Sequence, residues 1–232
     1  MKIFSLVVTA VVLAGCSSAP PTIQMGEDAE ISFDGLHRVD HARFESAWAD
    51  PDIDFSRYAK VMPGGAEYEF RAVRESSRTA RARSSDTEFW ISDADRERLV
   101  EETSAIFAEE IGNSTRFEVT DTRGDDVIII RGALHDIVSR VPPDMVGRGE
   151  VWLSSVGEAT IIIEVVDSMS NEVIFRAAER RAAEPGQGQG TMGVRSNSVT
   201  TWSEVRRLIR RWARTLREGL DSIPGGDASA AQ

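Results

Sequence analysis

The residue whose type and setting suggest chemistry most directly is Cys16, the only cysteine in the 232-residue chain. It follows Leu13-Ala14-Gly15, in which Ala14 and Gly15 are small. These residues end an apolar run that begins at Ile3, after the basic Lys2. A basic start, a short apolar core and small residues before a cleavage point are typical of a secretory signal peptide. The run is shorter than the roughly 20 residues that span a bilayer as a helix. We therefore predict that residues 1–15 are a signal peptide.

Leu13-Ala14-Gly15-Cys16 resembles the lipobox of bacterial lipoproteins. The resemblance implies a diacylglycerol on the Cys16 sulfur, cleavage before this residue and acylation of the new amino group. Ser17 follows the cysteine, and by analogy with lipoprotein sorting in Gram-negative bacteria it indicates the outer membrane rather than the inner. We expect a lipid-anchored, periplasm-facing protein. A catalytic thiol is the alternative, but no histidine lies within twenty residues to act as its base.

Three histidines could support metal or acid–base chemistry. His37 and His41 have the spacing with which two imidazoles on one helix reach a common metal ion. They resemble an inverted zinc-hydrolase motif only loosely, because Asp40 replaces the glutamate and no third ligand is evident. His135 lies in a predicted strand with Asp136 pointing to the opposite face, and no Gly-x-Ser-x-Gly elbow supplies a nucleophile. We therefore expect no metal site and no catalytic residues, with an envelope-modifying hydrolase that uses these histidines as the alternative.

The segment Gly188-Gln189-Gly190-Thr191-Met192-Gly193 matches the G-x-G-x-x-G pattern of dinucleotide sites. Such a site requires the glycines to lead directly from a strand into a helix N-terminus. Residues 194–201 intervene here, so we interpret residues 184–198 as a mobile loop and expect no cofactor. The adjacent acids Glu109-Glu110 and Asp125-Asp126 point to diverging sides and are interpreted as solvated.

Arginines gather in two places in a chain whose formal net charge is −11. Five of them lie within thirteen residues that contain one acid: Arg71, Arg74, Arg78, Arg81 and Arg83. We predict these five as a candidate binding surface for an envelope protein or an anionic envelope component such as lipid phosphate. Six more lie near the C-terminus, where pairing with an acidic helix is the favoured interpretation. Net charge and compartment argue against nucleic acid as a partner.

Two helices and several strands must position these residues. Ser92, with Asp95 three residues later, is a capping-box-like start, and apolar residues at helical spacing continue until Gly112. This pattern predicts an amphipathic helix with an acidic outer face. A second amphipathic helix is predicted from Trp202 to Ile223, with an apolar stripe opposite the six C-terminal arginines.

Strands are predicted over residues 59–62, 67–73, 117–120, 125–141, 159–166 and 172–178. Pro63-Gly64-Gly65 is expected to break the chain between the first two, and the last two are expected to form a hairpin. The order of elements predicts an α+β fold: a single domain with a mixed β-sheet and two amphipathic helices packed on it.

We divide the mature chain into three parts. Residues 16–50 are predicted as a lipidated N-terminus, a tether and an irregular segment without clear periodicity. Residues 51–223 are predicted as the periplasmic α+β domain, and residues 224–232 as a disordered tail.

Several of these features together resemble the bacterial lipoprotein family DUF3313 over about residues 50–223. They are the lipobox, Asp54-Phe55-Ser56-Arg57-Tyr58 before a strand, Glu164-Val165-Val166-Asp167 at a strand end, and Trp202 with Trp212-Ala213. The usual glycine of the following turn is replaced here by Ser170-Asn171. The family has no established activity, so the resemblance implies only localisation and domain type. We expect a non-enzymatic binding or assembly module for another envelope component, for which an accessory subunit of an export system is one version.

Overall fold

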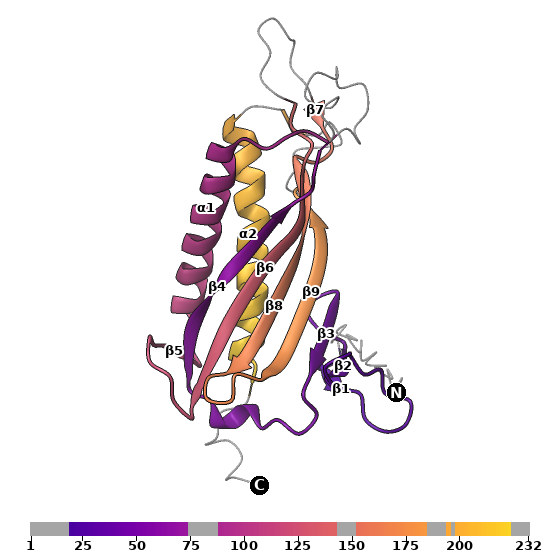
Figure 1. The fold of residues 1–232 in the computed structure, drawn as a ribbon, viewed down its shortest axis with the longest axis vertical. Helices are drawn as coiled ribbons and strands as arrows, with labels where there is room; N and C mark the ends of the chain where they lie inside the picture. The colour runs from indigo at the N-terminus through magenta and orange to yellow at the C-terminus, as the bar shows by residue number, and fades with distance from the viewer. Residues whose placement is uncertain (1–18, 74–87, 143–151, 185–193, 196–197, 224–232) are drawn as a thin grey trace, which may run out of the picture.

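The protein folds as one mixed β-sheet with two long helices against one of its faces (Figure 1). The computed structural model describes residues 19–73, 88–142, 152–184, 194–195 and 198–223. The predicted α+β class, with a mixed sheet and two packed helices, is confirmed. Among the described residues, no helix has both the length and the hydropathy to cross a bilayer.

Four long strands form the centre of the sheet: β4 (Lys60–Phe70), β6 (Val127–Ser139), β8 (Gly157–Asp167) and β9 (Val173–Ala182). The strand order is β1-β2-β3-β9-β8-β6-β4-β5. β4 runs parallel to β5 (Glu118–Val119) and to β6, while β6, β8 and β9 are successively antiparallel. The predicted hairpin of β8 and β9 is therefore confirmed. A separate two-stranded ladder joins β7 (Trp152–Leu153) to β10 (Val194–Arg195).

β4 is a single strand, so the predicted break at Pro63-Gly64-Gly65 is wrong. The chain stays paired with β6 on both sides of this tripeptide, and the irregularity is a register shift between Pro63 and Ala66. Gly65 takes a positive φ of 87°, a conformation that glycine adopts without strain. Gly64 packs so closely that a Cβ there would lie 2.5 Å from the Ile129 Cγ2. The tripeptide is a bulge because a long neighbouring strand holds both of its halves.

The N-terminal segment was expected to be irregular up to residue 50, and this is also wrong. It contains β1 (Thr22–Ile23), β2 (His37–Asp40) and β3 (Ser46–Ala49), which extend the sheet beyond β9. Ala47 and Ala49 of β3 are buried, whereas Trp48 lies between them on the opposite face. The Arg38 guanidinium stacks 4.9 Å from the centre of the Trp48 ring.

The two helices lie side by side on one face of the sheet (Figure 1). α1 (Asp93–Gly112) begins as predicted, because Ser92 Oγ accepts a hydrogen bond from the Asp95 amide at 3.1 Å. α2 (Ser198–Asp221) starts four residues before the predicted position and ends two residues before it. Arg206 donates to Glu102 of α1 at 3.0 Å. This contact agrees with the expected pairing of the arginine-rich helix with the acidic one.

The core lies between the helices and the sheet. Alternate residues of β8 point toward the helices, and Ile161, Ile163 and Val165 are buried there. Trp212 of α2 is the largest of the fully buried side chains, and its indole N–H donates to Glu179 Oε2 at 3.0 Å. Each buried methylene contributes about 0.8 kcal/mol, so this layer supplies much of the stability of a domain that has no disulfide.

Candidate functional site

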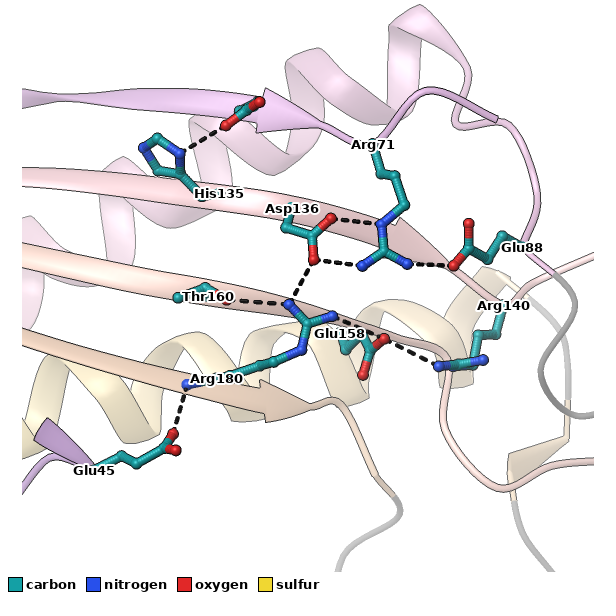
Figure 2. A network of polar contacts seen from close by, with 10 residues as sticks. Glu45, Arg71, Glu88, His135, Asp136, Arg140, Glu158, Thr160 and Arg180 are labelled. Carbon is teal, nitrogen blue, oxygen red and sulfur yellow. Dashed lines mark hydrogen bonds and ion pairs between the residues drawn. The ribbon is translucent and has the colours of Figure 1, made fainter. Parts of the chain in front are cut away.

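The opposite face of the sheet carries a network of arginines and acids at one end of the long strands (Figure 2). Arg71 donates from Nε to Asp136 Oδ1 at 2.5 Å, and its other nitrogens contact Asp136 Oδ2 and Glu88. Arg180 bridges Asp136 at 2.6 Å and Glu158 at 3.0 Å. Hydrogen bonds from Arg71, and then from Arg180, lower the pKa of Asp136 to about 2, although partial burial opposes them. The network is internally paired and stabilises this end of the sheet.

Of the five arginines predicted as a binding surface, the structure describes only Arg71. Its guanidinium is bound by two carboxylates, so it is not a free cation for a partner. The other four predicted residues, Arg74, Arg78, Arg81 and Arg83, lie outside the described residues, as do Cys16, the Gly188–Gly193 motif and the predicted tail. For them the sequence-based predictions stand as predictions.

The three histidines form no common site among the described residues. His37 lies in β2 with its Nδ1 2.8 Å from the Gln24 carbonyl oxygen, and His41 follows the strand with φ 55°. The helical geometry that would bring them to one metal ion is therefore absent from this segment. His135 Nδ1 lies 2.7 Å from Glu69 Oε2. Among the described residues, no group of three or more potential ligands could hold a metal ion.

The expected relation between His135 and Asp136 is wrong. Asp136 has φ 54°, and the pairing of β6 with β8 shifts between His135 and Val138. At such a bulge two successive side chains point to the same side of a sheet. Arg180 consequently contacts both Thr160, which pairs with His135 across the sheet, and the Asp136 carboxylate, as Figure 2 shows.

Asp167 joins two of the sequence motifs on which the family resemblance rests, residues 54–58 and residues 164–167. Its carboxylate accepts hydrogen bonds from Arg57 at 2.5 Å, from the Tyr58 hydroxyl at 2.8 Å, and from the amides of Met169 and Ser170. Burial alone raises the pKa of Asp167, but these donors outweigh it and lower the value to about 2. Burial and the same contact raise the pKa of Tyr58 to about 12. The motif residues therefore fix the short helix η1 (Phe55–Arg57) to the end of β8.

A cavity of about 720 Å³ lies between the N-terminal strands and the last turns of α2. Strands β1–β3, η1, β8, β9 and α2 all contribute to its walls. Most of the lining side chains are apolar, among them Ile23, Val39, Phe44, Phe175, Leu216 and Leu220. Its size falls within the roughly 300–1,000 Å³ that is usual for small-molecule sites. Among the described lining residues there is no histidine, cysteine or lysine, so the cavity is built for burial of apolar groups.

Polar and small residues mark the rim of this cavity. Arg43 lies there with its Nη1 3.7 Å from Glu218 Oε2, and Asp54 adds a further carboxylate. Gly219 of α2 also lines the cavity, where a Cβ would meet only the Arg43 Cδ, at 3.8 Å. Pro20 and Pro21 line it as well, so the chain passes this site close to its N-terminus.

Sequence reasoning missed this cavity, because nearly half of its lining residues come from the segment interpreted as irregular. The signals that could have indicated it are small residues at positions facing the core. Ala47 and Ala49 alternate with Trp48, and Gly219 interrupts an otherwise good helical sequence. Small side chains on converging elements leave space between those elements.

A family model described as "Protein of unknown function (DUF3313)" matches residues 28–216. No curated protein matches the chain. Several solved structures are similar. The PelC dodecamer from Paraburkholderia phytofirmans has 12% sequence identity and a TM-score of 0.34, covering 74% of this chain and 94% of that one.

Two other solved structures show a similar degree of likeness. A DUF330 protein from Xanthomonas campestris has 10% identity and a TM-score of 0.39, covering 79% of this chain and 94% of that one. A putative neuraminyllactose-binding hemagglutinin homolog from Helicobacter pylori has 8% identity and a TM-score of 0.30, covering 78% and 92%.

Proposed function

Because this chain belongs to DUF3313, a family of unknown function, we propose its role from its own residues: an outer-membrane-anchored periplasmic lipoprotein that acts as a non-enzymatic binding module. The observation that carries this proposal is the apolar cavity between β1–β3 and α2. A hollow of this kind gains binding energy from burial of apolar surface. Its hydroxyl groups, on Ser56, Thr215 and Ser222, have no histidine or lysine among the described lining residues to activate them. The one carboxylate that lines the cavity, Asp54, is a weakened base, because its hydrogen bonds with Ser56 lower its pKa.

The position of the cavity supports the membrane part of the proposal. Cys16 precedes Pro20 by four residues, and four residues span at most about 14 Å. A lipid on Cys16 therefore holds the cavity close to the bilayer surface. A three-chain anchor is effectively permanent, since even one acyl chain contributes about 0.8 kcal/mol per buried methylene.

The hydrolase alternative has less support. His37 faces a backbone carbonyl and His135 faces Glu69, and neither lines the cavity. An enzyme that used them would need a nucleophile or a metal ion beside the imidazole.

Fractionation tests the anchor. We expect the wild-type chain in the outer-membrane fraction, labelled by radioactive palmitate, and we expect Cys16→Ala to lose the label and leave that fraction. Wild-type protein that carries no label, or a Cys16→Ala variant that stays in the outer membrane unlabelled, contradicts the lipoprotein proposal.

In-cell photo-crosslinking tests the binding module. A photoreactive amino acid at the exposed Ser222, on the cavity rim, is compared with the same group at the exposed Ser104 of α1. We expect a defined adduct from position 222 only, and the same adduct when His37, His41 and His135 are all alanine. An adduct that disappears in the triple-alanine variant favours the hydrolase, and equal adducts from both positions argue against the cavity as the site.

A further inference from the structure

We propose that the cavity between β1–β3 and α2 binds one acyl chain of a zwitterionic membrane phospholipid, with the head group at the rim beside Arg43. This inference rests on the proposed function, because it names the ligand of the same site.

The walls of the cavity select the chemical class of the ligand. Apolar side chains from strands, η1 and α2 line a half-open pocket of about 720 Å³. A polar ligand placed among Val39, Phe175 and Leu216 would lose its hydrogen bonds to water without replacement. A flexible hydrocarbon chain has no hydrogen bonds to lose, and each methylene that it buries adds to the binding free energy.

The rim selects the head group. Arg43 is exposed there, at 3.7 Å from Glu218, and Asp54 lies on the same rim. The rim therefore carries both signs of charge. A phosphate fits the guanidinium and an ammonium fits the carboxylates, so a head group with both charges is complementary. A free fatty acid, with a single negative charge, would meet the acids as well as the arginine.

Gly219 keeps the space for the chain open. It lies within α2, where glycine costs roughly 1 kcal/mol relative to alanine, yet a Cβ there has only the flexible Arg43 side chain nearby. A larger side chain at this position would project from the helix into the cavity, so Gly219→Leu should fill the site without disturbing the fold.

The N-terminal part of the chain brings the cavity to its ligand. Pro20 and Pro21 line the rim, and Cys16 lies only four residues earlier. An anchored domain consequently presents this rim within about 14 Å of the lipid attachment point. Membrane phospholipids are then the acyl chains at the highest local concentration.

The test uses the full chain with Cys16→Ala, so that binding does not depend on the anchor. The probe is a phosphatidylethanolamine that carries a photoactivatable diazirine on one acyl chain, presented in vesicles of phosphatidylethanolamine and phosphatidylglycerol. Gly219→Leu is the blocking variant. Gly112→Leu is the matched control, because Gly112 also lies in a helix and a Cβ there has nothing within 4 Å.

We expect the label on peptides from the cavity walls, including residues 38–55 or 215–223. Gly219→Leu should lower labelling at least about tenfold, the loss for two excluded methylenes, while Gly112→Leu leaves it unchanged. Thermal unfolding checks the fold, and Gly219→Leu should melt no lower than the parent chain because leucine favours the helix.

Four outcomes overturn the inference or one of its parts. Equal labelling of Gly219→Leu and Gly112→Leu places the lipid elsewhere. Full competition by oleate, or preference for a phosphatidylglycerol probe, overturns the zwitterionic head group. If a photoreactive amino acid at position 222 of the anchored protein crosslinks to the lipid on the chain's own Cys16, the acyl chain in the cavity does not come from a membrane phospholipid. If the Cys16→Ala chain is not labelled by the lipid probe but position 222 still gives its protein adduct, the lipid ligand is refuted while the proposed binding module is not.

Discussion

Asp167 is a single charged group that connects residues 54–58 to the end of β8. Its replacement by asparagine tests how much this connection contributes to the stability of the fold. The carboxylate is buried and accepts hydrogen bonds from four donors, which are Arg57, Tyr58 and the amides of Met169 and Ser170. Its pKa falls from the usual 3.8 to about 2. A difference of this size between the unfolded and folded chain corresponds to about 2 kcal/mol of stability at neutral pH.

We therefore expect Asp167→Asn to lower the free energy of unfolding by about 2 kcal/mol at pH 7. The folded pKa lies below the unfolded one, so this stabilisation is complete above the unfolded value of 3.8 and is lost as the pH falls through about 2. The stabilities of the parent and the variant should thus converge as the pH is lowered. Urea denaturation followed by circular dichroism, at several pH values between about 7 and 2, measures both quantities.

Asp121→Asn is the control, because Asp121 is exposed and its replacement should leave stability nearly unchanged. The reasoning is refuted if Asp167→Asn is as stable as the parent at pH 7. It is also refuted if the difference between them stays constant down to pH about 2, since the charge of Asp167 would then not be its source.

Three further substitutions test other parts of the fold. Gly157→Ala should destabilise by about 1–3 kcal/mol or prevent folding, because its Cβ would lie 2.3 Å from the Val138 carbonyl oxygen; a normal melting temperature contradicts this. Trp212→Phe leaves the buried Glu179 without its indole donor and should cost about 1–3 kcal/mol in urea denaturation. Asp136→Asn should cost less than about 1 kcal/mol, because its side chain is 37% exposed, and a larger loss by the same assay would mean that the network is more cooperative than its exposure indicates.

Elements with a strong local signal were predictable from the sequence. The Ser92 cap and the helical spacing after it gave α1, and the long apolar runs gave β6 and the hairpin of β8 and β9. In each case neighbours in the chain determine the structure. Neighbours also determine η1, where Asp54 accepts a hydrogen bond from the Ser56 amide at 2.9 Å, although the sequence analysis predicts no helix there.

Features that depend on distant partners were not predictable. Pro63-Gly64-Gly65 has the composition of a turn, and only pairing with β6 keeps it extended. β3 is only four residues long, too short for its alternation to be recognised, and it becomes a strand because the edge of β9 is available to it. The cavity follows from several such placements together, so no single stretch of sequence indicates it. Asp167 illustrates the same limit: both motifs are visible in the sequence, but their contact spans more than one hundred positions.

The short strands at the sheet edge have a mechanical consequence. A force that pulls the chain at Pro20 away from the sheet acts first on β1, then on β2 and β3, each paired to the next by a few hydrogen bonds. Such an edge yields bond by bond at low load, whereas β6 and β8 share the load over a long ladder. Peeling residues 22–49 would release up to about 90 Å of chain and remove one wall of the cavity. Tension applied at Pro20 would thus release residues 22–49 and remove this wall before the core is strained.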